Sequence, residues 1–184
     1  KNQFNLAKAI LPPGMPGYDP MKDPYPFSEA QARNLLAEAA FPKRKDSPLL
    51  EIWSASRSEA AQRELNEIKS QLSKIGIQSN IHYETNWPNF ESMLRENKAP
   101  VFIYAWYADF PDPDNFLGIL FHSKSKYNYT AYYNSEVDRL LDQARIERDY
   151  LKRIEMYRKI EDIVLEDAPI VPMVNHLFQM VYQP

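Results

Sequence analysis

The fold is decided by residues 49–76, LLEIWSASRSEAAQRELNEIKSQLSKIG. The first part of this stretch, residues 49–55, is an apolar run of the kind that strands favour. The part that follows has one apolar face at helical spacing, formed by Leu65, Ile68, Leu72 and Ile75. Gly76 comes next and suits a left-handed helix C-cap. A strand joined directly to an amphipathic helix predicts an α/β unit.

The alternation of strand and helix continues on the C-terminal side of this unit. Residues 77–85 alternate well enough for a second strand, and Pro88 is placed for the first turn of a helix that runs to about Asn97. Residues 101–107 form a continuous apolar and aromatic run, as expected for a strand covered on both faces. Ser56 and Glu59 fit a capping box for the helix that precedes Gly76.

The flanking segments differ in character from this centre. Residues 1–27 are a proline-rich lead-in that excludes a helix, and at Ser28 a capping box with Gln31 opens a short helix to about Ala40. Two further helices are expected after residue 133, with inward faces formed by Val137, Leu140, Leu141, Ala144, Ile154, Tyr157, Ile160 and Val164. Residues 168–181 read as extended and apolar. The whole pattern predicts an α/β fold with mostly sandwiched strands and helices on the faces of the sheet.

Length and composition bound the possible functions. The 184 residues, 44% of them hydrophobic, suit a single packed domain over residues 1–184. The net charge of −3 disfavours a nucleic-acid partner, and the basic cluster at residues 43–45 is expected to be a solvated turn. The longest apolar run, residues 99–108, is too short to span a membrane. The absence of Cys excludes disulfides and thiolate chemistry but does not decide the compartment.

No residue pattern points to an enzyme, a metal site or a cofactor. His82, His122 and His176 lie far apart in sequence and lack metal-ligand spacing, so each is expected on the surface or in a loop. With only 4 Gly, a phosphate-binding glycine loop is not expected. A Ser-His-Asp triad is not excluded by sequence, but nothing indicates one.

The loop after the third strand carries the candidate chemistry. Asp112 before Pro113 is expected to be an N-cap, and Asp114 then suits the positive end of a helix dipole. Asp109 has no such explanation and follows the most buried strand, where open α/β sheets place ligands. Together with Trp106 and Tyr107 it would make a receptor for an ammonium group, through charge pairing and cation–π contact. The alternative is that Asp109 caps a turn while the aromatic residues fill the core.

A second aromatic segment stays open to two interpretations. Residues 127–133, YNYTAYY, contain four tyrosines among polar neighbours. Most of the aromatic residues of the chain are expected in the core, but tyrosines in loops also form binding surfaces.

Four collinear blocks of sequence resemble the C-terminal part of the family 5 extracellular solute-binding proteins, the receptors of ABC importers for peptides, nickel and related solutes. The blocks are residues 11–20, LPPGMPGYDP; residues 30–40, AQARNLLAEAA; residues 106–117, WYADFPDPDNFL; and residues 133–141, YNSEVDRLL, continuing through Arg153 and Tyr157 to residues 168–172, APIVP. They cover nearly the whole chain in order.

The resemblance implies a fold and a site. The chain would be the C-terminal lobe, domain III, of a two-lobed periplasmic binding protein, and this lobe would be an α/β fold with a mixed β-sheet flanked by helices. Residues 1–27 would lie on the hinge side, and the N-terminal lobe would be missing. In peptide-binding members the Asp of the W-x-A-D stretch receives the α-ammonium of the peptide. That role is carried over to Asp109, with Trp106 and Tyr107 as neighbouring ligand-binding residues.

The resemblance also implies a function. The protein would capture oligopeptides, dipeptides or similar amino-bearing solutes outside the cytoplasm, in a periplasmic or lipid-anchored form, and deliver them to the membrane permease of an ABC importer. It would bind without catalysis and without a cofactor. The alternative is a solute-sensing lobe of a regulatory protein, which an upstream helix-turn-helix rather than a secretion signal would indicate. A glycosidase using Asp109 with a second carboxylate is a third, weaker interpretation.

Overall fold

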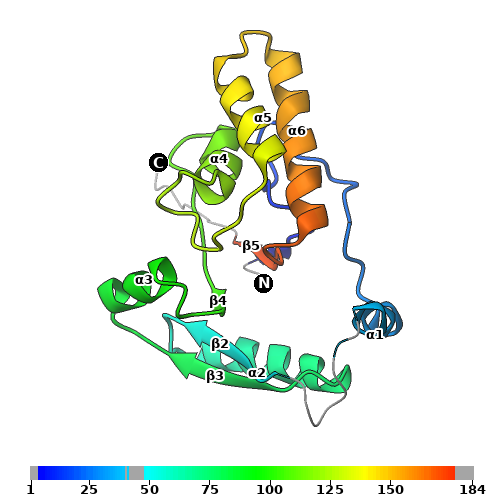
Figure 1. Cartoon of the computed structure of the whole chain (residues 1–184), viewed down its shortest axis with the longest axis vertical. Coiled ribbons are helices and arrows are strands. Elements are labelled where there is room, and N and C mark those ends of the chain that lie inside the picture. Colours follow the sequence, from blue (N-terminus) through cyan, green and yellow to red (C-terminus); the bar gives the residue numbers. More distant parts are fainter. Residues whose placement is uncertain (1–3, 40, 42–47, 177–184) are drawn as a thin grey trace, which may run out of the picture. The chain divides into compact units, whose positions relative to one another are not determined.

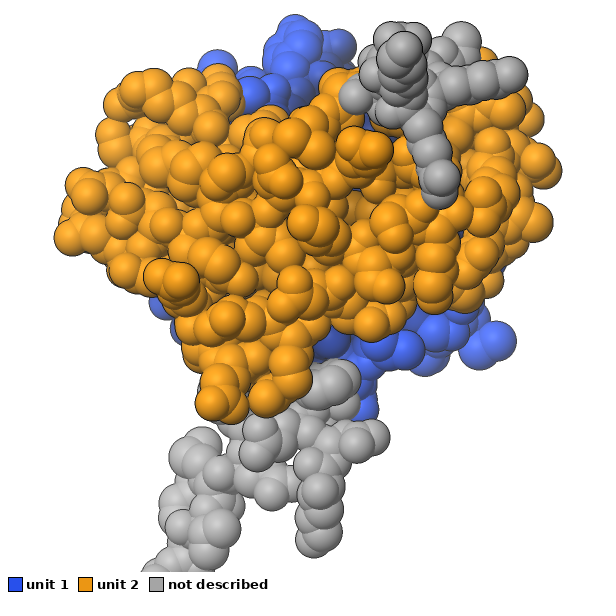
Figure 2. Space-filling model, turned by 90° about the horizontal axis from the view of Figure 1, so that it is seen from below, with its two compact units in different colours: residues 1–26, 106–184 blue, residues 27–105 orange. Residues whose placement is uncertain are grey.

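The computed structural model describes residues 4–39, 41 and 48–176. The chain divides into two compact units, one made of residues 1–26 and 106–184 and the other of residues 27–105, coloured separately in Figure 2. That the two units together form one lobe, as the sequence predicts, stays a prediction. The basic cluster at residues 43–45 and the end of the predicted C-terminal extended segment lie outside the described residues.

Residues 27–105 form a small parallel α/β unit. Its sheet has the order β3-β2-β4, with β2 (Leu50–Ser54) paired in parallel with β3 (Ser79–Tyr83) and with β4 (Val101–Ile103). Helix α2 (Glu59–Lys74) connects β2 to β3, and α3 (Trp87–Arg95) connects β3 to β4 (Figure 1). Parallel neighbours need such crossover helices because a tight turn cannot join them. Helix α1 (Glu29–Glu38) precedes the sheet.

The local signals of this unit mostly act as predicted. The Ser28 side chain accepts from the Gln31 amide at the start of α1, and Gly76 adopts a left-handed φ of 94° after α2. Pro88 lies in the first turn of α3. The predicted cap Ser56 is wrong, because Ser58 accepts from the Ala61 amide and caps α2 instead. The unit is held by a small core formed by Ile52, Leu65, Phe90, Leu94 and Ala99.

The third strand differs from its prediction. Strand β4 ends at Ile103, whereas the apolar run predicted a strand through residue 107. All three residues of β4 are only partly buried, so the strand is not covered on both faces. Residues 104–108 separate it from Asp109, and Asp109 therefore does not directly follow the carboxyl end of a buried strand. The aromatic content of residues 101–107 reflects a short edge strand plus an irregular segment.

The other unit is mainly helical and contains a two-stranded antiparallel sheet of β1 (Phe4–Leu6) and β5 (Val174–His176). A 3₁₀ helix, η1 (Pro113–Asn115), leads into α4 (Leu117–Phe121). Helices α5 (Ser135–Ile146) and α6 (Tyr150–Asp167) form an antiparallel hairpin beside α4 (Figure 1). The predicted α/β fold is thus confirmed, with parallel pairing in one sheet and antiparallel pairing in the other.

The core of this unit joins the hairpin to the lead-in. All eight residues predicted to face inward on the two helices are buried. All of them except Ile154 pack with Leu117 and Phe121 of α4 and with a lead-in group formed by Ala9, Ile10, Leu11 and Met15. The proline-rich lead-in therefore forms part of a hydrophobic core rather than a loose arm.

Glu161 fixes the lead-in to α6. This side chain is fully buried, and its Oε1 atom accepts hydrogen bonds from the Ile10 amide at 3.0 Å and the Leu11 amide at 2.7 Å. Its Oε2 atom pairs with Lys22 Nζ at 2.9 Å. Both oxygen atoms of the Glu161 carboxylate therefore have hydrogen-bond partners. A buried charge is tolerated under this condition.

Candidate functional site

The candidate carboxylate Asp109 lies at an exposed bend in the segment between β4 and η1. Within the residues that the structure describes, its side chain makes no ion pair and no hydrogen bond. It neither caps a turn nor points into the core, so the structural alternative raised by the sequence is not observed. A carboxylate without an ion pair of its own is open to pairing with an incoming cation.

The other two carboxylates of the same loop are already paired. Asp112 forms a two-point ion pair with Arg153 of α6, with Oδ2–Nη1 and Oδ1–Nη2 distances of 2.8 and 2.9 Å. Asp114 pairs with Arg145 of α5, with an Oδ1–Nε distance of 3.0 Å. The loop therefore presents one unpaired negative charge, on Asp109, among the described residues.

Asp112 combines this ion pair with the predicted N-cap. Its Oδ1 atom also accepts the Asp114 amide at 2.9 Å, which caps η1. Burial opposes the charged form, but the hydrogen bonds from Arg153 and the Asp114 amide outweigh it and hold the pKa of Asp112 below its usual range. The Asp112 carboxylate is therefore structural, and it is charged at neutral pH.

Gly118 makes room for the second ion pair. A Cβ atom at this position would lie 2.6 Å from Asp114 Cγ and 2.7 Å from Arg145 Nη2, closer than side chains tolerate. The absence of a side chain at the start of α4 thus lets Asp114 and Arg145 meet against the helix backbone.

Trp106 is held in a fixed orientation. Its Nε1 atom donates to the Asn115 carbonyl oxygen at 2.7 Å and lies 3.1 Å from Asn115 Oδ1. Its ring lies 5.4 Å from the Tyr127 ring, centroid to centroid, in a tilted arrangement. Trp106 and Tyr127 therefore form an aromatic pair near the loop that carries Asp109, while Asn115 is fully buried behind Trp106.

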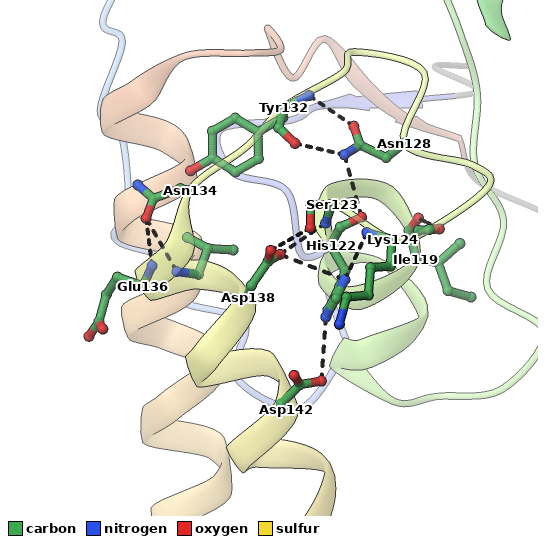
Figure 3. Close-up of polar contacts among 12 residues, drawn as sticks. Ile119, His122, Ser123, Lys124, Asn128, Tyr132, Asn134, Glu136, Asp138 and Asp142 are labelled. Atoms are coloured by element: carbon green, nitrogen blue, oxygen red, sulfur yellow. Dashed lines mark hydrogen bonds and ion pairs between the residues drawn. The ribbon is translucent and has the colours of Figure 1, made fainter.

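The tyrosine-rich segment is a loop held by hydrogen bonds of its own residues (Figure 3). Asn128 bridges it from within, because Nδ2 donates to the Tyr132 carbonyl at 2.8 Å and Oδ1 accepts the Tyr132 amide at 3.1 Å. Four residues before this segment, the Ser123 amide donates to Asp138 of α5 at 2.9 Å. At its end, Tyr132 Oη donates to Asp167 of α6 at 2.6 Å. The loop is thus tied to both helices of the hairpin.

The tyrosines of this loop have different environments. Tyr129 is buried and Tyr133 is 71% exposed, with Tyr127 and Tyr132 between these extremes. Burial and the hydrogen bond to Asp167 both raise the pKa of Tyr132, so its hydroxyl is a permanent donor. A Lys126 Nζ atom lies 4.9 Å from the Tyr127 ring centroid, so that ring already has one cation on it.

The structure brings together part of the predicted site. Trp106 is half-buried, and both Tyr107 and Phe110 are more than half exposed, so these two do not fill the core as the alternative proposed. Asn115 and Arg153 were not predicted as site residues, because their partners lie 9 and 41 residues away in sequence. Tyr127 was named only as one of several loop tyrosines.

His122 and the acidic side chains of the chain are the residues that bear on a histidine-based or metal-binding site, which the sequence does not predict. His122 lies in a loop position directly after α4, as one of the two predicted alternatives had it, but it is buried, and its Nδ1 atom accepts the Lys124 amide at 3.1 Å (Figure 3). Across the described part of the chain, no group of three His, Asp or Glu residues is arranged to hold a metal ion. Among the described helices, none combines the length and apolar character needed to cross a membrane.

Comparison with known families gives a match over most of the chain. A family described as bacterial extracellular solute-binding proteins, family 5 Middle, matches residues 1–128. The heme-binding protein A of Haemophilus influenzae is 31% identical, over 92% of this chain and 31% of that protein. The dipeptide-binding protein of Escherichia coli K12 is 28% identical, over 89% of this chain and 31% of that protein.

Solved structures give the same result. HbpA2 from Haemophilus parasuis has a TM-score of 0.85 and 26% identity, covering 95% of this chain and 35% of that one. A dipeptide-binding protein from Pseudoalteromonas sp. SM9913, in complex with Met-Leu, has a TM-score of 0.80 and 27% identity, covering 95% and 35%. This chain thus spans about a third of the length of the proteins that it matches.

Proposed function

Because this chain belongs to the bacterial extracellular solute-binding proteins of family 5, we propose that it is the C-terminal lobe of a receptor that captures small peptides, or similar solutes with a free amino group, for an ABC importer. The proposal includes delivery of the solute to a membrane permease. Its main support from the site is the contrast between Asp109, which is exposed and unpaired among the described residues, and the paired Asp112 and Asp114.

The names of the relatives support a small organic solute but span several classes. They include a dipeptide-binding protein, glutathione-binding proteins and a heme-binding protein. Dipeptides and glutathione carry an ammonium group, whereas heme has none. An unpaired carboxylate beside aromatic residues favours a ligand of the first kind, because it offers charge pairing and cation–π contact to an ammonium group.

The length of the chain supports a role as one part of a larger receptor. Since it spans about a third of its relatives, the remaining part of the ligand shell would come from an N-terminal lobe of the same protein. Closure of two lobes around a ligand is a hinge motion, and the closed state is favoured by contacts that form only there. In that state Asp109 would lose water and bind the ammonium group more strongly than at an exposed surface.

The proposed location is outside the cytoplasmic membrane. Relatives of this chain include a periplasmic murein tripeptide-binding protein and a periplasmic oligopeptide-binding protein. We extend this location to the receptor that contains this chain, with a lipid anchor as one possible form of it. Because these relatives are binding proteins, we also propose that the receptor binds its ligand without changing it chemically. The alternative is a regulatory sensor built on the same lobe. Solute uptake that requires both this protein and a membrane permease would favour the import receptor over the sensor.

We expect Asp109→Asn, introduced into the full receptor that contains this chain, to weaken the binding of the dipeptide Met-Leu. Hydrogen bonds to charged groups contribute about 1.5–3 kcal/mol, so the affinity should fall by about 10- to 100-fold. Isothermal titration calorimetry measures this change. A matched control is Glu155→Gln, which removes an exposed carboxylate on α6 and should leave the affinity unchanged.

The chemistry of the ligand provides the complementary test. N-acetyl-Met-Leu lacks the ammonium group, so wild type and Asp109→Asn should bind it equally weakly. Heme also lacks an ammonium group, so Asp109→Asn should not change the affinity for heme. Unchanged Met-Leu affinity in Asp109→Asn would refute the proposed role of this carboxylate.

A further inference from the structure

We propose that Arg153 of α6 is a positioning residue for solute binding, which fixes the backbone that presents Asp109 by holding Asp112. This inference rests on the proposed role of Asp109. Arg153 does not contact the ligand in this proposal. It acts through the loop, and its effect is therefore distinct from that of the carboxylate that binds the ammonium group.

Arg153 is anchored at every polar end of its side chain. Two of its nitrogens form the paired contacts of 2.8 and 2.9 Å with Asp112, and Nε donates to the Ala144 carbonyl of α5 at 3.0 Å. The guanidinium carbon lies 4.9 Å from the Tyr157 ring centroid, and Nη2 is 3.1 Å from Tyr157 Oη. Three elements thus meet at one planar group: α5, α6 and the loop.

The base of this side chain is rigid. Arg153 lies in the first turns of α6, next to Ile154, which is 8% exposed, and one turn before Tyr157, which is fully buried. The Asp149 side chain caps the helix by accepting the Lys152 amide at 3.1 Å. The guanidinium group is therefore held in place from the helix side, and only 21% of the Arg153 side chain is exposed.

The link from Asp112 to Asp109 is short and stiff. Pro111 has a fixed φ, and a residue before proline, here Phe110, is restricted to extended conformations. The Asp112 amide also donates to the Phe110 carbonyl at 2.8 Å. On the other side of Asp109, Ala108 packs against the core of the same unit. With Ala108 and Asp112 both fixed, little freedom is left for the backbone of Asp109.

Lysine could not replace Arg153 in this role. A lysine ammonium is a point charge on a flexible stem and cannot make two parallel bonds to one carboxylate while also reaching the Ala144 carbonyl. Arg153→Lys therefore keeps the charge and removes the geometry. Arg153→Met removes both and keeps most of the apolar stem.

The test is a double-mutant cycle in the full receptor, with Met-Leu as the probe and calorimetry as the measurement. We expect Arg153→Met to weaken binding by about tenfold when Asp109 is present and by less than about twofold in an Asp109→Asn background, because the two residues act on one interaction. Arg153→Lys should give a loss between wild type and Arg153→Met. Asp112→Asn should lower the affinity in the same direction.

Arg139→Met is the matched control. Arg139 also forms a two-point contact with a carboxylate, at 2.8 and 2.7 Å from Glu136, but that pair lies within α5 and does not touch the loop. Its removal should leave Met-Leu affinity unchanged. Thermal unfolding first shows whether each variant is folded at the assay temperature. If Arg153→Met is not folded, Arg153→Lys replaces it in the double-mutant cycle.

The outcomes separate the two proposals. If Asp109→Asn leaves the affinity unchanged, the proposed function fails first. If Asp109→Asn weakens binding but Arg153→Met has no effect, or the same effect in both backgrounds, the positioning role is refuted while the role of Asp109 stands. Equal losses for Met-Leu and N-acetyl-Met-Leu in Arg153→Met would also refute it, since positioning of Asp109 concerns only the ammonium group.

Discussion

At the residue scale, Glu161 shows how a single carboxylate joins two distant segments of the chain. It is the one fully buried carboxylate of the described residues, and it accepts from the amides of Ile10 and Leu11 and from Lys22. Removing one partner of a buried ion pair is costly because the other charge loses its compensation.

We therefore expect Glu161→Gln to lower the free energy of unfolding by about 3 kcal/mol, the lower end for a broken buried pair. The lower end applies because Lys22 keeps its 2.6 Å contact with Asp162. Urea denaturation followed by far-UV circular dichroism measures the change. Glu166→Gln, at an exposed position of the same helix, should change stability by less than about 0.5 kcal/mol. A loss below about 1 kcal/mol for Glu161→Gln would contradict this account.

The candidate site was only partly predictable at this scale, for a physical reason. The N-cap role of Asp112 depends on its own neighbours, Pro113 and Asp114, and could be predicted from local sequence. The contact of Arg153 with Asp112 depends on how α6 packs, which no local pattern encodes. The burial of His122 could not be predicted for the same reason, because the packing around α4 buries a residue type that is more often exposed.

At the element scale, periodic helices were easier to predict than strands. The inward faces of α5 and α6 follow from a 3.6-residue period over three turns or more, and all the predicted positions are buried. Strand β4 was predicted too long, because an apolar aromatic run does not distinguish a strand from an irregular segment. The cap of α2 moved from Ser56 to Ser58 because several serines precede that helix, and boundaries are the least certain feature of a sequence pattern.

The ion pair between Asp112, the N-cap of η1, and Arg153 of α6 gives a prediction about how stability depends on pH. The pKa of Asp112 is lowered from the ordinary value of 3.8, so its ion pair with Arg153 contributes stability that is fully present above pH 3.8 and is lost as pH falls through the lower, folded-state pKa. We expect Asp112→Asn to cost about 2 kcal/mol at pH 7, in the range for charge-assisted hydrogen bonds, and this difference from wild type should shrink only below pH 3.8.

Urea denaturation at a series of pH values measures this difference. In an Arg153→Met background most of the pH dependence should disappear, because the Asp114 amide then remains as the main partner of the Asp112 carboxylate. If the stability difference between wild type and Asp112→Asn already declines between pH 7 and pH 5, a group other than Asp112 causes the pH dependence.

At the scale of the whole molecule, each unit has its own core, and the lead-in belongs to the unit that contains the hairpin. The sequence placed the α/β character correctly but not this division, because residues 1–26 join residues 106–184 only through long-range contacts such as those of Glu161. Asp109 is carried by the same unit as Arg153, so the positioning contacts do not depend on the parallel sheet.

This organisation leads to a prediction for the chain on its own. Asp109 is exposed here, and an ion pair formed in water contributes only about 0–1 kcal/mol, which is less than the entropy cost of ordering a dipeptide. A second lobe would exclude water from the pair and supply the remaining contacts to the ligand. We therefore expect the 184-residue chain to bind Met-Leu with a Kd weaker than about 1 mM, measured by calorimetry, while the full receptor binds it far more tightly. Micromolar binding by this chain alone would mean that its own residues, without a second lobe, already form a complete site.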